Sequence, residues 1–300
     1  MIKNSNFGLM FHHFHNNGNK PSFQGSITPQ IFKKIILQIG VKNIINPYDF
    51  INGIVNGNLK PGQVCLTFDD ALFSQYKYAL PIMDNYKLKS FWFIYTSVFE
   101  KKSNNFEVYK YFYNNYYNSF NEFFNNFKKK VKDIFPLKKI FFDKHYFKHF
   151  KIYSKSEREY RFIRDKILSD YEFNEILNSM IKDKKVNLDY VKKKLYLNSK
   201  HVKKLFKEGH AIGLHSHNHP TSFEDLTLQD QKKEYTKCHR MIKKITNSPP
   251  ISMSHPCNSY NKTTLKILKK MKIKIGFRAD NSIQTFSKLE LPRIDCKDLL

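Results

Sequence analysis

The chain has 300 residues, of which 41% are hydrophobic and 16% aromatic, and 52 Lys and Arg against 26 Asp and Glu give a formal net charge of +26. The aromatic content excludes a fully disordered chain, and the length fits one large domain or two small ones. The sequence has no run of about 18 apolar residues, so no transmembrane helix is predicted.

Short apolar segments alternate with helical patterns in the first third of the chain. The helix expected at residues 28–40 has Thr28 as its N-cap, Pro29 in its first turn and Gly40 as its stop signal. The other elements expected here are strands at 7–14, 63–68 and 90–96 and a helix at 73–87.

Residues 100–196 are rich in Lys, Phe, Tyr and Asn and contain almost no Gly or Pro. A loop of this length without structure of its own is unusual in a compact domain. We therefore expect a mostly helical insertion, whose aromatic side chains pack on the main body.

Strand and helix alternate again after the insertion. We expect helices at 197–210, 227–246 and 261–273 and strands at 211–216, 251–256, 274–279 and 289–294. This alternation is typical of parallel strands in an α/β barrel or a doubly wound sheet.

The net charge has two interpretations. It could mark a nucleic-acid or anionic-membrane partner. The lysines are scattered, and Asn, Ile, Phe and Tyr are also abundant, which favours a general bias in composition. We expect no specific nucleic-acid partner, and leave peripheral membrane association and oligomeric state open.

Cysteine usage indicates the compartment. The four cysteines form no CxxC pair and no disulfide framework, and the first 20 residues show no secretory signal pattern. We expect reduced thiols and a cytoplasmic protein.

Two polar clusters follow predicted strands, at the strand ends where α/β folds place their active sites. Asp69 and Asp70 end one strand, and "HSHNHP", residues 215–220, ends another. Alone, the first could be a helix N-cap and the second a polar loop. Together, one Asp with His215 and His219 makes three ligands with room for water, as in a catalytic metal site.

Four motifs in order, "TFDD" (67–70), "HSHNHP" (215–220), "SHPCNSYN" (254–261) and "LPRID" (291–295), resemble the polysaccharide deacetylase family, carbohydrate esterase family four. The resemblance covers about residues 7–99 and 197–300. It implies one domain over 1–300, with 100–196 inserted, folded as a distorted parallel (β/α) barrel of about seven strands. It also implies metal-dependent removal of acetyl from an N-acetylated sugar.

The resemblance assigns roles residue by residue. Asp69 matches the general base; Asp70, His215 and His219 match the ligands of one divalent metal; Ser216 supports the His loop; His217 falls at a variable position. Zn²⁺ suits this ligand set, and Co²⁺, Ni²⁺ and Fe²⁺ are compatible with it. Cys257 matches the residue whose backbone N–H holds the oxyanion.

Two family residues are displaced in this chain. The usual third-motif Arg is missing, and Arg293 is expected to orient Asp69 in its place. The usual C-terminal histidine is also missing, so we expect His12, in "MFHH", to be the general acid, with His255 as its rival and His13 on the other strand face.

We expect a cytoplasmic N-deacetylase acting on an intracellular sugar precursor of a surface glycan, since no export signal is recognised. Two alternatives stay open: a metal-dependent amidase acting on a small non-sugar amide, and a basic nucleic-acid or membrane-surface binding protein with a degenerate metal site.

Overall fold

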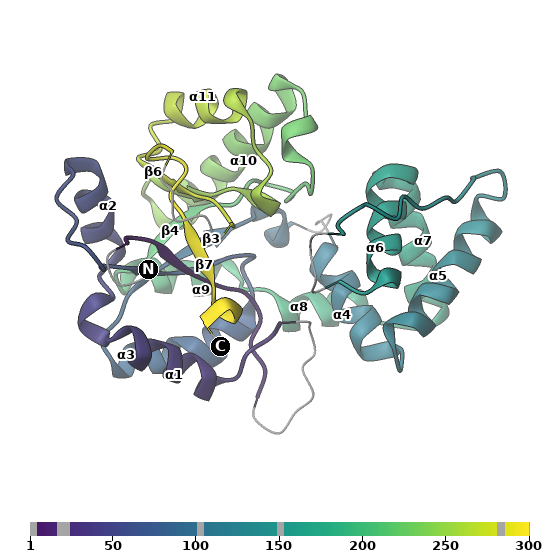
Figure 1. Ribbon diagram of the computed structural model, residues 1–300, viewed down its shortest axis with the longest axis horizontal. Coiled ribbons are helices and arrows are strands. Elements are labelled where there is room, and N and C mark those ends of the chain that lie inside the picture. The colour runs from purple at the N-terminus through teal and green to yellow at the C-terminus, as the bar shows by residue number, and fades with distance from the viewer. Residues whose placement is uncertain (1–4, 17–24, 101–104, 149–152, 281–285, 300) are drawn as a thin grey trace. The chain divides into compact units, whose positions relative to one another are not determined.

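The computed structural model describes residues 5–16, 25–100, 105–148, 153–280 and 286–299. It forms two compact units: Met1–Asn104 joined with Lys193–Leu300, and Asn105–Lys192. Parts of the predicted insertion, at 101–104 and 149–152, lie outside the described residues. Each unit is described by itself below (Figure 1).

The first unit is built on seven parallel strands in the order β6-β5-β4-β3-β2-β1-β7. A parallel bridge between Phe277, which ends β6, and Leu291, which precedes β7, brings the two edge strands together. The sheet is therefore a nearly closed, distorted barrel, as the resemblance implies. The strands are β1 (Gly8–Phe11), β2 (Cys65–Phe68), β3 (Ser90–Ile94), β4 (Ala211–Leu214), β5 (Ser252–Ser254), β6 (Ile275–Phe277) and β7 (Arg293–Asp295).

Helices follow the strands, and their starts agree with the capping signals. The Thr28 hydroxyl accepts the Ile31 amide at 3.3 Å, which starts α1, and Gly40 ends it. The α-helices of this unit are α1 (Pro29–Ile39), α2 (Pro47–Asn56), α3 (Leu80–Asn85), α9 (Ser199–Lys207), α10 (Leu228–Thr246) and α11 (Lys262–Lys270). Short 3₁₀ helices are η2 (Val41–Asn43), η4 (Thr96–Phe99), η6 (Phe223–Asp225), η7 (Pro256–Asn258) and η8 (Cys296–Leu299), and η3 (Gln75–Ala79) is a π-helix.

Helix α2 was not predicted from the sequence. Gly53 lies in its middle and lowers its helix propensity. The glycine permits a close approach, since a Cβ there would lie 2.7 Å from Leu59 Cδ1. Packing therefore overrides local propensity at this helix.

Successive side chains on the strands enter two different cores. On β3, Trp92 and Ile94 pack in the core shared with α1, α9 and α10. Phe91 and Phe93 face the other way, into a core with α2 and the inner faces of the neighbouring strands. This alternation, with its period of two, determines which strand-end residues face the inside of the barrel.

The second unit is helical, as predicted for the insertion. Its helices are α4 (Phe106–Tyr116), α5 (Phe120–Ile134), α6 (Lys155–Phe162) and α7 (Asp170–Asp183), with the π-helix η5 (Ile163–Ile167); α8 (Leu188–Leu195) leads back to the first unit. Its buried aromatics form their own core around Phe123, Phe127 and Tyr160. Within this unit, the aromatics that the sequence analysis expected to cover the main body pack on one another.

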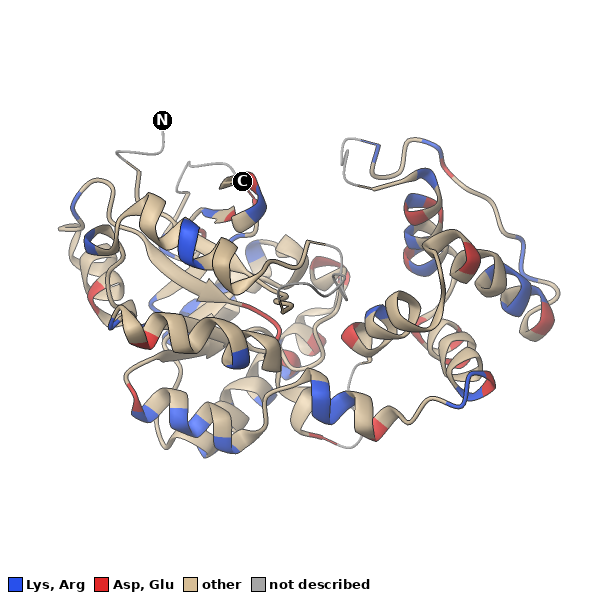
Figure 2. Cartoon of the chain, turned by 90° about the horizontal axis from the view of Figure 1, so that it is seen from below, with Lys and Arg blue, Asp and Glu red and all other residues tan. Residues whose placement is uncertain are grey.

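Charge is spread over the molecule. Figure 2 shows Lys and Arg on helices of both units. This spread agrees with the scattered lysines of the sequence. Among the described residues, no helix is both long and apolar enough to cross a membrane.

Candidate metal centre

The two polar clusters lie at the ends of two strands of the barrel. Asp69 and Asp70 follow β2, and the loop that begins at His215 follows β4; β3 lies between these two strands. The carboxyl ends of parallel strands meet at one edge, so the two clusters face each other. Asp70 has a φ of 74°, so the chain turns sharply directly after the strand.

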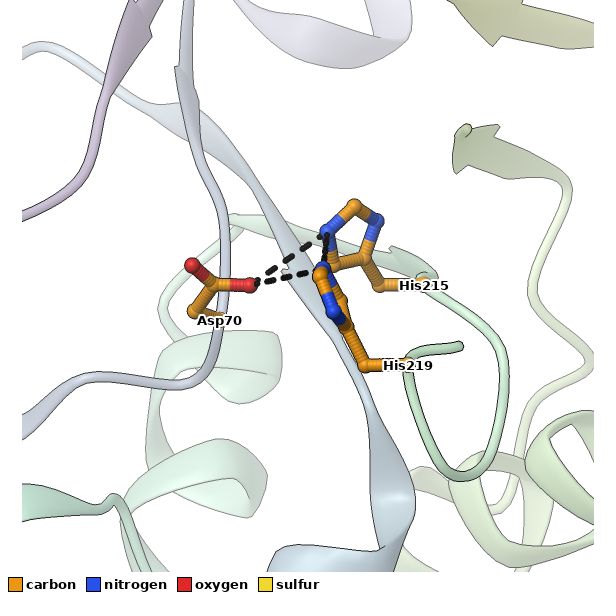
Figure 3. A group of neighbouring side chains, drawn as sticks. All are labelled: Asp70, His215 and His219. Atoms are coloured by element: carbon orange, nitrogen blue, oxygen red, sulfur yellow. Dashed lines mark hydrogen bonds and ion pairs between the residues drawn. The ribbon is translucent and has the colours of Figure 1, made fainter. Parts of the chain in front are cut away.

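Asp70, His215 and His219 each offer one ligand atom, and these atoms lie within 4.8 Å of one another (Figure 3). Asp70 Oδ1 is 3.4 Å from His215 Nε2 and 3.3 Å from His219 Nε2. The two Nε2 atoms are 3.1 Å apart. All three residues are buried, and their polar atoms point toward one another (Figure 3).

The hydrogen bond at Nδ1 determines the tautomer of His215 and leaves its Nε2 available to a metal. His215 Nδ1 lies 3.0 Å from the Ser254 carbonyl oxygen, which can only accept, so Nδ1 carries the proton. In neutral His215, Nε2 then presents a lone pair toward the Asp70 carboxylate. A cation between these atoms removes the repulsion, and a hydrogen bond from the other ring nitrogen is the usual arrangement of a metal-bound histidine. The residues present therefore fit a divalent metal.

Asp69 is held by a buried ion pair. Arg293 Nη1 donates to Asp69 Oδ1 at 2.8 Å, and both side chains are almost completely buried. Arg293 Nε also donates to the Arg278 carbonyl oxygen at 2.6 Å. Burial alone would raise the pKa of Asp69, but Arg293, His215 and His12 outweigh it and hold this pKa below its usual value. Asp69 is therefore ionised at neutral pH.

His12 lies beside both carboxylates. Its Nε2 is 3.9 Å from Asp69 Oδ2 and 4.0 Å from Asp70 Oδ2, and the side chain is 35% exposed. A group in this position can reach a substrate and exchange protons with solvent. His13, in contrast, is buried.

The rival histidine, His255, is engaged elsewhere. Its Nε2 lies 2.9 Å from the Leu289 carbonyl oxygen, and its ring stacks on Tyr260 with centroids 4.0 Å apart. Burial lowers the pKa of His255 to about 3. A neutral histidine whose Nε2 proton is already bound to a carbonyl is a poor proton donor, so geometry favours His12.

The other residues named from the sequence lie around this site. Ser216 Oγ accepts the His219 amide at 3.0 Å, within the loop that carries the ligands. His217 turns away: its Nδ1 is 2.8 Å from Thr96 Oγ1 and its Nε2 is 3.4 Å from Glu100. Cys257 lies beyond β5, with an exposed side chain and a φ of 51°.

Two residues that connect the site were missed by the sequence analysis. The Ser254 hydroxyl lies 2.8 Å from His215 Nδ1 and donates to Asp69 Oδ2 at 3.3 Å. Gln75 Nε2 donates to the carbonyl oxygens of His12, at 2.9 Å, and Asp69, at 2.6 Å. Ser254 is the first residue of the motif "SHPCNSYN", which was the available signal, whereas Gln75 had none.

A third missed residue is Glu234 on α10. Its carboxylate accepts the amides of His217 and Asn218, at 2.9 and 2.7 Å. In the sequence it is one acidic residue in a long helix rich in lysine, and no pattern distinguishes it from a surface charge.

Comparison with known families was made on the sequence and on the fold. Residues 176–276 match the family model described as polysaccharide deacetylase. The match includes both histidine ligands and Ser254, and the resemblance to this family is confirmed over these residues. No curated protein sequence matches the chain.

Several solved structures share the fold along nearly the whole chain. The Streptococcus pyogenes deacetylase PplD, in complex with acetate, is 18% identical, with a TM-score of 0.57 over 98% of this chain and 96% of its own. IcaB from Ammonifex degensii is 11% identical, with a TM-score of 0.58 over 97% and 91%. A de-N-acetylase from Aggregatibacter actinomycetemcomitans is 12% identical, with a TM-score of 0.57 over 97% and 95%. At these identities the likeness establishes the fold.

Proposed function

We propose that this chain, whose residues 176–276 carry the polysaccharide deacetylase sequence pattern, is a metal-dependent hydrolase that removes acetyl from an N-acetylated sugar. One observation carries the proposal. The converging ligand atoms of Asp70, His215 and His219 lie beside a second, ionised carboxylate, Asp69. Hydrolysis of an amide can be catalysed by a metal ion that activates water and an adjacent base that accepts the proton of this water. The fold shared with deacetylases supports it.

Asp70, His215 and His219 would hold the metal. A divalent ion there supplies Lewis-acid polarisation of the acetyl carbonyl and lowers the pKa of a water molecule toward about 7. Zn²⁺ is the ion we favour, because two imidazoles and one carboxylate with an open position are a common zinc donor set.

The residues around the metal site divide the proton transfers between them. Asp69 accepts the proton of the attacking water, and Arg293 keeps it ionised and oriented through their 2.8 Å contact. His12, which is within 4.0 Å of both carboxylates, donates a proton to the departing amine. The backbone N–H of Cys257 is proposed to stabilise the oxyanion, a role that uses no side chain.

The proposal extends to the substrate and its compartment. All four cysteines are free thiols, which fits a reducing cytoplasm. We therefore propose an intracellular precursor, a nucleotide- or lipid-linked acetamido sugar, as the substrate. Fractionation of cells with an antibody to the chain tests the location, and recovery outside the cytoplasm would contradict it.

A substrate panel tests the function. Purified, zinc-loaded protein is incubated with nucleotide-linked and lipid-linked N-acetyl sugars, N-acetylated oligosaccharides and small non-sugar acetamides, and acetate is measured. We expect release from N-acetyl sugars that stops when the metal is chelated. Release only from non-sugar amides would make the chain an amidase of another class. No release from any amide, together with nucleic-acid binding that weakens steeply with salt, would favour a basic binding protein.

A further inference from the structure

The loop that carries both histidine ligands has an uncommon backbone. Ser216 has a φ of 60° and His219 a φ of 54°, both in the left-handed region that non-glycine residues rarely occupy. Such conformations cost about 1–3 kcal/mol each and persist only where surrounding contacts enforce them. The contacts that hold this loop are therefore part of what places the two ligands.

Glu234 supplies a charged contact to the middle of this loop. Its Oε2 accepts the amides of His217, at 2.9 Å, and Asn218, at 2.7 Å. Its Oε1 accepts Asn218 Nδ2, also at 2.7 Å. Successive backbone amides that point to one spot form a concave anion site, and hydrogen bonds to a carboxylate are about twice as strong as neutral ones.

Helix η4, which follows β3, holds the loop through neutral hydrogen bonds. The amide of Ser97 donates to the His217 carbonyl oxygen at 2.9 Å, and the amide of Thr96 donates to that of Ser216 at 3.4 Å. These bonds fix the loop carbonyls, whereas Glu234 fixes the amides. Together, the two sets of contacts bind both the carbonyl oxygens and the amides of the loop.

We propose that Glu234 is a positioning residue, which holds residues 215–219 in the conformation that directs His215 and His219 at the metal. This inference rests on the proposed metal site and adds a residue to it. Glu234 contacts the backbone amides of His217 and Asn218 and the side chain of Asn218, which are the two residues directly before His219. It therefore acts on the two histidines through the loop backbone.

Metal affinity of the folded protein is the readout. Zinc affinity is measured by competition with a chromophoric chelator for the wild type, Glu234→Ala, Glu234→Gln and the control Glu208→Ala. Glu208 is an exposed glutamate of the same unit, and its carboxylate lies 3.7 Å from Lys204 Nζ. Far-UV circular dichroism verifies folding, and hydrogen exchange of the His217 and Asn218 amides is followed by NMR without metal.

We expect Glu234→Ala to weaken zinc binding about 10–100-fold, the usual effect of removing a partner of metal ligands. In this variant the amide hydrogens of His217 and Asn218 should exchange with solvent faster, although the fold is retained. Glu234→Gln keeps one oxygen but turns an NH₂ toward Asn218 Nδ2, so a smaller loss of a few-fold is expected. Glu208→Ala should bind zinc as the wild type does.

Zinc affinity within threefold of the wild type in folded Glu234→Ala would overturn the inference. If that variant does not fold, Glu234→Gln decides: unchanged affinity together with unchanged amide exchange overturns it. A wild-type chain that binds no divalent metal would refute the proposed function itself. In that case, faster exchange in the Glu234 variants would still show that this side chain holds the loop.

Discussion

The contact between Arg293 and Asp69 yields a quantitative prediction. Both side chains are almost completely buried, and one guanidinium nitrogen lies 2.8 Å from a carboxylate oxygen. Arg293→Met keeps much of the volume but leaves the Asp69 charge without its main partner. Removing one member of a buried pair typically costs about 3–5 kcal/mol, a large part of the roughly 5–15 kcal/mol that stabilises a domain.

The assay is a double-mutant cycle by urea unfolding of metal-free protein at pH 7, with Arg293→Met, Asp69→Asn and the double variant. We expect each single variant to be destabilised by several kcal/mol, and the double variant to lose at least about 1.5 kcal/mol less than the sum, since residues in contact couple by 0.5–3 kcal/mol. The double variant removes both charges and leaves neither buried alone.

The cost of Arg293→Met should also depend on pH. Burial raises the pKa of Asp69, and Arg293 is the first contribution that offsets it. In the variant this pKa rises, so the lost stability is full where Asp69 is ionised and shrinks as pH falls and the carboxyl group becomes protonated. Additive effects within about 0.5 kcal/mol, or a cost that is independent of pH, would refute this account of the pair.

Three further predictions follow from the same site and its surroundings. Asp69→Asn should bind metal as the wild type does but lose about 10²–10⁴-fold in kcat; loss of metal instead would mean that Asp69 is a ligand. His12→Gln should slow N-acetyl hydrolysis by a similar factor, yet change little for 4-nitrophenyl acetate, whose leaving group needs no proton; equal losses on both substrates would exclude the acid role. Burial lowers the pKa values of His210 and His255 to about 3, below the value of about 6.5 in unfolded chains. Each group therefore contributes stability above pH 6.5 that is lost as the pH falls. The free energy of unfolding should decrease by about 1.4 kcal/mol per pH unit for each group. Urea unfolding between pH 6.5 and 4.5 should show this slope, and His255→Phe should reduce it by one group; an unchanged slope would contradict the burial argument.

The sequence contained enough to predict that Asp70, His215 and His219 come together. Asp70 and His219 follow apolar strands that the pattern identified, and parallel strands bring their carboxyl ends together. Helix α1 was equally predictable, because Thr28 and Gly40 mark its ends chemically. In both cases the sequence signal is local, and the fold class then determines which strand ends lie side by side.

Features that depend on distant contacts were harder to predict. The strand expected at 289–294 is in fact β7, Arg293–Asp295, preceded by the Leu291 bridge that nearly closes the barrel. This register depends on pairing with β1 and β6, which the local sequence does not encode. The contact of Gln75 with His12 likewise arises only when residues 63 positions apart pack together, and that of Glu234 with His217 only when α10 folds back on the loop before it.

The insertion illustrates the same limit. Its helices were expected from the lack of Gly and Pro, and Ser154 and Ser169 begin two of them with capping boxes. Which surface its aromatics cover could not be read from periodicity, because an amphipathic helix shows that it has an apolar face but not what covers that face.

Zinc titration of the stripped protein, with acetate release measured at each step, is the decisive test of the proposed metal-dependent hydrolysis. Hydrolysis of an N-acetyl sugar should rise from baseline and saturate at one equivalent of metal per chain. His219→Ala should release no acetate at any step, while Glu208→Ala, altered at an exposed glutamate outside the ligand loop that pairs with Lys204 at 3.7 Å, should follow the wild type. If the stripped protein released acetate at a rate that zinc did not change, or if His219→Ala were fully active, the proposed metal-dependent hydrolysis would be contradicted.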